Sequence, residues 1–445
     1  MNSRLFSPKA IRRMLIPLVF EQLMIVLVGL VDTALLSGIN QSSLAAFSLV
    51  DSINQLLTQF FLAIGAGGAI IAAQYLGSED RKGAEQTANQ AALMVLSISA
   101  LIAVPVMLLK SPILHLLYPR INPEIRGFSE QYLLLSAISY PFFALYNSGT
   151  SMLYAQGHSK LSMMTSIGMN SAKILMNYLF INIWKMDIAG AGLATILSRV
   201  IGAFMVTLFL MDQHAPIHYT RPFKLHYNRF TIKRILTVAL PSGFENIVFL
   251  TCKLLIGMMI ASYSGAMIAA NAAANTISTY ISVPANAINL VTITVISQCV
   301  GAGRGQEAKR ISKLLQLGTI ASLVITGSLV ALFMGPIVGM LKLGTEAHQI
   351  TRNLMFVYCA VAVILHTPAF GLPNTLRAAG DNRYVMYAAV VSVVVFRLLG
   401  SYVLGNLMNL QVYGIWYAMY LDWLGRSVFF LWRFKGNKWL EHRLV

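Results

Sequence analysis

The segment PLVFEQLMIVLVGLVD (Pro17–Asp32) is almost entirely apolar, yet it contains two carboxylates, Glu21 and Asp32. In a soluble core both would need partners. In a bilayer each would cost several kcal/mol unless it faced a protein interior or a water-filled cavity. The whole chain favours the bilayer, because 57% of its 445 residues are hydrophobic, 11% are charged and the mean hydropathy is +0.67. Soluble proteins are about a quarter charged, so we predict an all-α integral membrane protein.

Apolar runs long enough for a membrane crossing, about 20 residues each, occur twelve times. We predict transmembrane helices at residues 14–37, 46–76, 86–109, 129–155, 161–184, 189–212, 234–260, 268–300, 312–335, 352–376, 384–408 and 412–434. A polar connection near the middle of the chain separates the sixth span from the seventh. It predicts an N-lobe at 1–212 with spans 1–6, a cytoplasmic linker at 213–233 and a C-lobe at 234–445 with spans 7–12.

The formal net charge of +17 follows from topology. The 33 Lys and Arg residues are roughly fourfold more frequent in one alternate set of connections than in the other, as the positive-inside rule requires of cytoplasmic loops. This bias predicts a multi-pass protein of the cell membrane with both termini cytoplasmic and no nucleic-acid partner. The three cysteines, Cys252, Cys299 and Cys359, lie in apolar runs without a CxxC pair, so we expect neither a disulfide framework nor a structural metal site.

The sequence repeats itself at an offset of 224 residues. PLVFEQ at 17–22 aligns with PSGFEN at 241–246. The same offset aligns Glu21 with Glu245, Lys173 with Arg397, and Gly190 with Gly414. Because six spans are an even number, the two halves share one orientation and are predicted to be related by a pseudo-two-fold axis along the membrane normal. Two such lobes on either side of a V-shaped cleft form the architecture of alternating access.

Several motifs resemble those of the multidrug and toxin extrusion (MATE) family, within the multidrug/oligosaccharidyl-lipid/polysaccharide flippase superfamily. They are PLVFEQ, VDTALLSG, AAFSLVDSI, GAGGAIIAAQYLGSED and GAGLATILSR in the first half, and PSGFENIVF, MIAANAAANTIS, SQCVGAGR and LRAAGDNR in the second. The resemblance covers nearly the whole chain. It implies a cation-coupled antiporter that exports small organic molecules by alternating access, as in multidrug efflux.

This resemblance implies no cofactor apart from the transported H⁺ or Na⁺, a small-molecule substrate and a monomer in the lipid bilayer. The chain contains no HExxH, GxSxG or Walker motif, so we do not expect an enzyme. Two alternatives stay open. One is a lipid-linked oligosaccharide flippase of the same superfamily, and the other is a channel, which would need a continuous pore.

The carboxylates of the opening segment can now be interpreted. Glu21 and Asp32 are 11 residues apart, so on a helix they lie within roughly 20° of one face and about 16 Å apart along it. A polar stripe of this kind fits a cavity wall. The resemblance places Asp32 at the N-lobe cation-binding aspartate of the family, where Na⁺ could bind, and Glu245 at its span-7 carboxylate.

The chain departs from the family pattern in span 5 and span 10. In MNSAKILMNYLFI, Lys173 replaces the asparagine of the family's sodium site, and Asn177 holds the second ligand position. An ammonium group has no lone pair and cannot bind Na⁺, so coupling to H⁺ is favoured and Lys173 could instead pair with Asp32. In span 10, His366 replaces the acid of the NorM-type branch, and an imidazole can carry a proton.

These arguments give two sets of candidate residues. The predicted cation-coupling residues are Asp32, Glu21, Glu245, Asn177 and His366. The predicted substrate-cavity residues are Lys173, Arg397, Lys253, Asn170, Arg199 and Asp422. Because bases and acids within the spans are nearly balanced in number, the sequence leaves cationic, zwitterionic and anionic substrates open.

Overall fold

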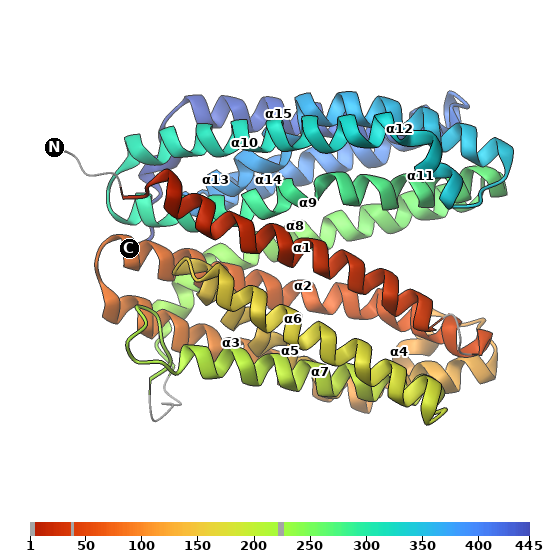
Figure 1. Cartoon of the computed structure of the whole chain (residues 1–445), viewed down its shortest axis with the longest axis horizontal. Helices are drawn as coiled ribbons and strands as arrows, with labels where there is room; N and C mark the ends of the chain where they lie inside the picture. Colours follow the sequence, from red (N-terminus) through yellow and green to blue (C-terminus); the bar gives the residue numbers. More distant parts are fainter. Residues whose placement is uncertain (1–4, 37–39, 221–226) are drawn as a thin grey trace. The chain divides into compact units, whose positions relative to one another are not determined.

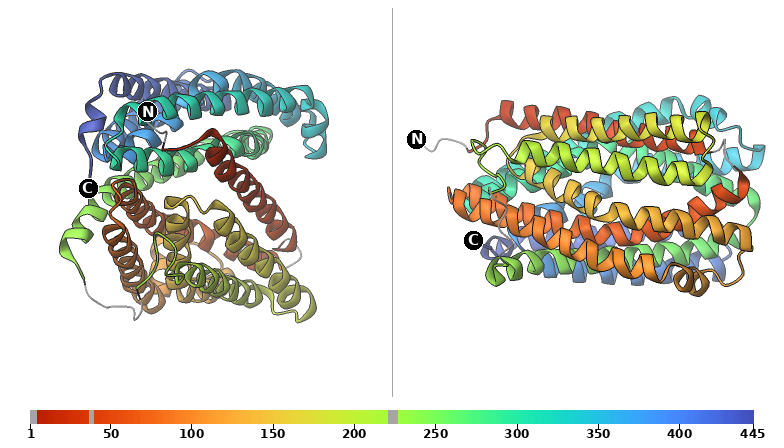
Figure 2. Two further views of the ribbon diagram at one scale, coloured as in Figure 1. Left: turned by 60° about the vertical axis from the view of Figure 1, so that its left-hand side comes forward. Right: turned by 90° about the horizontal axis from the view of Figure 1, so that it is seen from below.

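The computed structural model describes residues 5–36, 40–220 and 227–445, except for the side chains of residues 30, 32–34 and 36, and its secondary structure in these ranges is helical. Its contacts divide the chain into two compact units. The amino-terminal unit is Arg12–Gly243, and the carboxy-terminal unit is Phe244–Val445 together with Met1–Ile11. Within each unit the long helices run alongside one another (Figure 1 and Figure 2).

Helices account for the first half of the chain in the order α1 (Pro8–Leu36), α2 (Gln41–Gly77), α3 (Arg81–Leu108), α4 (Lys110–Leu117), α5 (Pro123–Ala155), α6 (Ser159–Asn177), η1 (Tyr178–Ile183) and α7 (Asp187–Leu210). The second half continues with α8 (Arg229–Ala261), α9 (Gly265–Gly301), α10 (Gly305–Leu332), α11 (Met334–Met340), α12 (Thr345–His366), η2 (Thr367–Gly371), α13 (Leu372–Ala379), α14 (Asn382–Ser392), η3 (Val393–Leu399), η4 (Tyr402–Leu407), α15 (Gln411–Lys435) and η5 (Lys438–Glu441). Each of the twelve predicted spans falls on a long helical segment of this series.

Eight of the described helical segments are long and apolar enough to cross a membrane: α2, α3, α7, α8, α9, α10, Thr345–Ala379 and Asn382–Leu407. A helix satisfies all its backbone hydrogen bonds internally, which is why apolar spans in lipid fold this way. The predicted all-α class is confirmed, and twelve crossings are consistent with the helices. The predicted lobe limits stay a prediction, and residues 221–226 of the predicted linker lie outside the described ranges.

The repeat predicted from the sequence extends to the ends of the helices. α2 and α9 both contain 37 residues, and the ends of α9 lie 224 residues after those of α2. The same offset relates α3 to α10 and η1 to η4. Even the backbone of the short connections repeats, because Lys185 and Asn409 have φ angles of 54° and 55°. The two halves therefore use one structural plan.

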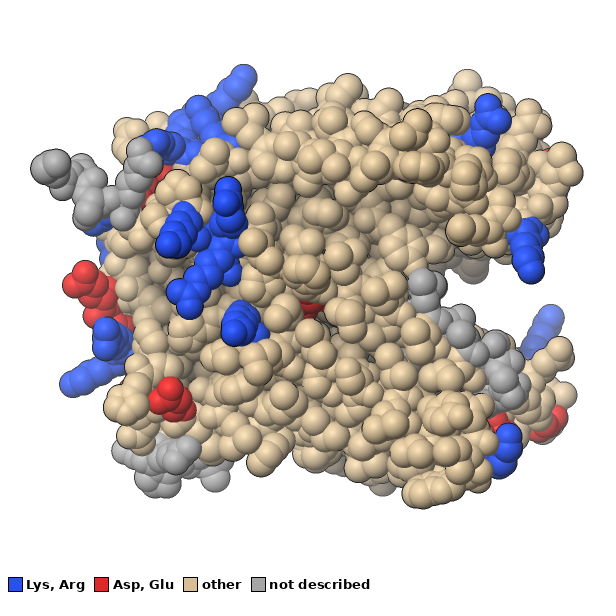
Figure 3. Space-filling view, viewed as in Figure 1, with Lys and Arg blue, Asp and Glu red and all other residues tan. Residues whose placement is uncertain are grey.

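The outer surface of the helices is suited to lipid. Leu101 and Leu108 of α3 and Leu332 of α10 are 73%, 76% and 75% exposed, and side chains of this kind are stable at a surface when hydrocarbon surrounds it. On the face drawn in Figure 3, the Lys and Arg side chains of the carboxy-terminal unit gather at the ends of its helices, away from the middle. This distribution fits a membrane-embedded belt between two polar ends.

Aromatic side chains form the core of the carboxy-terminal unit where α9, α12 and α15 meet. The ring of Tyr358 lies 6.0 Å from that of Trp416 and 5.7 Å from that of Trp423, both with edge-to-face geometry. Trp423 also lies 6.1 Å from Tyr420. Such pairs contribute beyond the area that they bury, and here they fix α15 against its neighbours.

Candidate functional site

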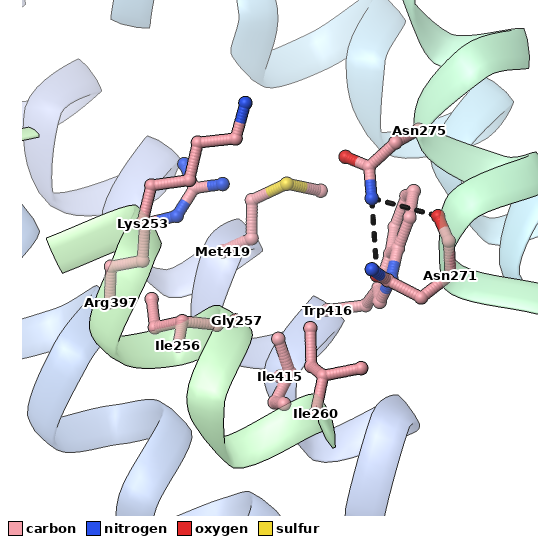
Figure 4. A pocket seen from close by; sticks show the side chains of 10 residues that line it. All are labelled: Lys253, Ile256, Gly257, Ile260, Asn271, Asn275, Arg397, Ile415, Trp416 and Met419. Atoms are coloured by element: carbon pink, nitrogen blue, oxygen red, sulfur yellow. Dashed lines mark hydrogen bonds between the residues drawn. The ribbon is translucent and has the colours of Figure 1, made fainter. Parts of the chain in front are cut away.

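A small cavity opens within the carboxy-terminal unit. Its volume is about 130 Å³. It is lined by Lys253, Ile256, Gly257 and Ile260 of α8, Asn271 and Asn275 of α9, Arg397 of η3, and Ile415, Trp416 and Met419 of α15. Figure 4 shows the two bases on one side of the cavity, the two asparagines and the tryptophan on the other, and the isoleucines between them. None of these lining residues is acidic, so the cavity is basic.

Hydrogen bonds orient the asparagine side of the cavity. The Oδ1 atom of Asn271 accepts from Trp416 Nε1 at 3.1 Å and from Asn275 Nδ2 at 3.2 Å. The carbonyl oxygen of Asn271 is therefore occupied, and its Nδ2 keeps its N–H donors for another acceptor. The helix that carries both asparagines begins at Ser264, whose side chain accepts from the backbone N–H of Met267.

An ion cluster lies behind Arg397. Asp422 is fully buried, and its Oδ1 atom accepts from Arg426 Nε at 2.9 Å. Its Oδ2 atom lies 3.7 Å from Arg397 Nη1. Both guanidinium groups also lie over the ring of Phe249, at 5.3 Å and 6.0 Å from its centre. Two positive charges share one carboxylate, so the cluster carries a net positive charge toward the cavity.

This geometry brings together three residues that the sequence assigned to a substrate cavity: Lys253, Arg397 and Asp422. Lys253 contacts no acid within ion-pair distance among the side chains that the structure describes. Arg397 is part of η3, a π-helical turn, and such turns are frequent at functional sites. The sequence analysis did not single out Asn271 and Asn275, although their spacing of four residues on one helix was a usable signal.

Glu245, a predicted coupling residue, forms an ion pair. Arg377 Nη2 lies 2.7 Å and 2.6 Å from the two carboxylate oxygens of Glu245. The sequence analysis had counted Arg377 only as a cytoplasmic basic residue. A parallel pair joins Arg433 Nε to Asp381 Oδ2 at 2.6 Å.

Glu21 has a different environment in the amino-terminal unit. The side chain is buried, accepts from Tyr154 OH at 2.7 Å and accepts from Ser162 Oγ at 3.2 Å. Among the described side chains, no base forms an ion pair with Glu21. Its partners are hydroxyl groups, which can both donate and accept, so the same site can hold a carboxylate or a carboxylic acid.

The predicted N-lobe coupling site is described only in part. Asp32 belongs to α1, but its side chain lies outside the described residues, so its pairing with Lys173 stays a prediction. Lys173 is half-buried on α6, and Asn177 is buried at the end of the same helix. Asn170 donates from Nδ2 to the carbonyl oxygen of Ser166 at 2.8 Å.

Arg199 and His366 lie apart from the cavity. Arg199 donates from Nη1 to Ser139 Oγ at 2.6 Å and stacks over Phe143, with 4.3 Å to the ring centre. His366 is buried at the end of α12 beside Phe370, with 4.9 Å between ring centres. Its Nδ1 atom has no hydrogen-bond partner among the described residues. Neither residue lines the basic cavity.

Metal-binding clusters of three or more His, Cys, Asp or Glu are absent from the described part of the chain. The three cysteines are free thiols.

The chain is similar to known transporters over nearly its whole length. It is 24% identical to "Uncharacterized transporter YisQ" of Bacillus subtilis over 96% of this chain and 93% of that protein. It is 23% identical to "Probable multidrug resistance protein NorM" of Thermotoga maritima, over 98% and 94% of the two chains.

Solved structures show the same fold. An outward-facing MATE transporter of the MOP superfamily matches with a TM-score of 0.86 at 19% identity, over 97% of this chain and 96% of that chain. A MOP-superfamily transporter from Pyrococcus furiosus, described as having a binding pocket of reverse polarity, gives the same TM-score, identity and coverage. The Vibrio cholerae MATE transporter VcmN matches with a TM-score of 0.89 at 16% identity, over 97% and 98% of the chains.

A family model called MatE matches residues 17–179 and again 241–403. The two matches begin and end 224 residues apart, at the offset of the internal repeat. Together they cover well over half of the sequence. The chain therefore belongs to the MatE family of membrane transporters.

Proposed function

We propose that this protein is a cation-coupled antiporter that exports small organic molecules by alternating access, as a monomer in the cell membrane with both termini in the cytoplasm. Family membership supports the transport function, and the name of the Thermotoga maritima relative points to multidrug efflux. The observation that carries the coupling is the buried carboxyl of Glu21, which is held by the hydroxyl groups of Tyr154 and Ser162. Ionisable groups inside transmembrane helices are costly and mark transport sites by default.

We assign the coupling to H⁺ rather than Na⁺. A sodium site needs several oxygen ligands, and Lys173 supplies donors where the family pattern has an amide oxygen. The hydroxyl partners of Glu21 support proton exchange, because they can rotate to donate to a carboxylate or to accept from a carboxylic acid. Asp32 is the second residue that we assign to the coupled proton, with Lys173 as its partner in one state.

Purified protein in liposomes tests this assignment with ethidium as substrate. A pH gradient at equal sodium on both sides should drive concentrative ethidium transport. Transport that follows a sodium gradient with pH clamped, and ignores a pH gradient, would contradict proton coupling. Saturable counterflow of labelled ethidium separates a transporter from a channel, and labelled lipid-linked oligosaccharide separates an exporter from a flippase.

Variants test the residues. Asp32→Asn should keep expression and counterflow but abolish concentrative transport, while the control Asp51→Asn, a carboxylate that accepts from Gln55 at 2.8 Å, should behave as wild type. Lys173→Asn restores the neutral ligand and should shift the pH–rate profile or introduce sodium dependence. Three superimposable profiles for wild type, Lys173→Asn and Lys173→Ala would show that Lys173 and Asp32 do not communicate.

Glu245 and His366 remain proposals as further coupling residues. Glu245 would have to release Arg377 before it could bind a proton, since both of its oxygens lie within hydrogen-bond distance of that guanidinium. Glu245→Gln should therefore affect stability more than the proton dependence of transport. A loss of pH-driven transport at unchanged thermal stability would place Glu245 in the coupling mechanism instead.

A further inference from the structure

We propose that the cavity between Lys253, Arg397 and Asn271 binds the anionic group of the exported substrate, a carboxylate, sulfonate or phosphate attached to an apolar body. This inference rests on the proposed export function and adds a substrate class to it. It concerns a site within the carboxy-terminal unit alone.

The charges in and behind the cavity support an anion. Three bases, Lys253, Arg397 and Arg426, surround a single acid, Asp422, among the described residues. Arg426 makes the closer contact with Asp422, 2.9 Å against 3.7 Å for Arg397. Lys253 and most of the donor capacity of Arg397 are thus available to a ligand. Uncompensated charge in a low-dielectric cavity is unfavourable, so a bound anion would complete the balance.

The polar geometry also suits an acceptor. Lys253 and Arg397 face the cavity from one side, and the amide groups of Asn271 and Asn275 face it from the other (Figure 4). The hydrogen bonds from Trp416 and Asn275 occupy the carbonyl oxygen of Asn271 and leave its N–H donors free. Hydrogen bonds from charged donors to an anion are about twice as strong as neutral ones.

Size limits what part of the substrate enters. The cavity measures about 130 Å³, while pockets for drug-sized ligands measure about 300–1,000 Å³. It therefore accommodates a head group and not a whole drug. The apolar side chains of Ile260, Trp416 and Met419 line the same cavity and can contact the adjoining apolar part of the ligand.

The internal repeat shows that this site was built in one half only. The 224-residue offset places Gly29 opposite Lys253, Phe47 opposite Asn271 and Gly192 opposite Trp416. The ion pair is also unique to the second half, since the same offset places Ser198 opposite Asp422 and Gly202 opposite Arg426. The shared scaffold does not require these polar side chains for its fold, which points to a ligand as the reason for them.

Binding of two dansyl probes to the purified full-length protein in detergent tests the inference. Dansylglycine carries a carboxylate, and its amide is uncharged with nearly the same shape. We expect the carboxylate to bind at least about tenfold more tightly in a fluorescence titration, because a charge-assisted hydrogen bond contributes about this factor. Equal affinity for the two probes would overturn the proposal.

Variants localise the site. Lys253 is exposed, so Lys253→Gln should fold normally and weaken dansylglycine binding about tenfold. Lys253→Glu should reverse the preference toward the cation dansylcadaverine. The matched control Lys313→Gln removes an exposed Lys of the same unit that lines no part of this cavity, and it should bind as wild type. Equal weakening by Lys253→Gln and Lys313→Gln would place the anion elsewhere.

Two further measurements separate the explanations. Displacement of dansylglycine by an equal concentration of phosphatidylglycerol would assign the cavity to a lipid head group and overturn the substrate assignment. Concentrative transport of ethidium without dansylglycine binding would leave the export function standing and refute only this inference. Lys253-dependent binding of dansylglycine without gradient-driven transport of either probe would support the anion site and refute the proposed export.

Discussion

The ion cluster of Asp422, Arg397 and Arg426 makes a sharp prediction about stability. Asp422→Asn preserves the size of the side chain but removes the only negative charge that faces the two guanidinium groups among the described residues. Arg426 Nε and Arg397 Nη1 lie 2.9 Å and 3.7 Å from the Asp422 oxygens. We expect a large loss of stability, because two positive charges then remain together in the interior of the bundle.

The magnitude follows from these distances. With an effective dielectric constant of about 20, unit charges 3–4 Å apart attract each other by about 4–6 kcal/mol. Much of this gross attraction offsets the desolvation of the ions, and removal of one partner from a buried pair costs about 3–5 kcal/mol. Replacement of both partners by neutral groups is far less costly. Asp422→Asn combined with Arg426→Met should therefore recover most of the loss.

Thermal unfolding of the purified protein, followed by circular dichroism in detergent, measures these differences. At about 2–4 °C per kcal/mol for a unit of about 200 residues, Asp422→Asn should lower Tm by roughly 6–20 °C. The half-exposed carboxylate of Asp51 accepts one hydrogen bond, from Gln55, so Asp51→Asn should change Tm by no more than about 2 °C. A double variant as unstable as Asp422→Asn, or a single variant with wild-type stability, would refute the charge argument.

Three further predictions concern separate parts of the chain. Glu21→Gln should retain ethidium counterflow and lose pH-driven concentration in liposomes; undiminished concentration would show that Glu21 binds no coupled proton. Gly414→Ala should destabilise the protein by about 1–3 kcal/mol, because its Cβ would lie 2.5 Å from the carbonyl carbon of Leu404, and a thermal scan that matches wild type would contradict this. Burial, and then the charge of Arg13, lower the pKa of His158 from 6.5, so stability should fall as pH drops below about 6.5; His158→Gln should reduce that dependence, and an identical pH dependence of Tm in both proteins would contradict it.

The sequence by itself determined the helices, because a lipid environment permits an apolar chain few other structures and because each span is long enough to be recognised. It also determined the repeat, since Pro17 and Pro241 lie 224 residues apart and the helices that contain the repeats begin and end in step. Within the site, the spacing of four residues between Asp422 and Arg426 on one helix already predicts their contact.

Only the tertiary structure decided which ionisable groups meet across helices. Glu245 and Arg377 are 132 residues apart, and Asn271 and Trp416 are 145 residues apart. The pairing of such residues depends on the rotation of each helix about its axis and on its packing against neighbours, which hydrophobic periodicity fixes only to within a broad face. For that reason the sequence could place Glu21, Glu245 and Arg397 inside the membrane, while the folded structure gave Glu21 hydroxyl partners, paired Glu245 with Arg377 and placed Arg397 in a basic cavity.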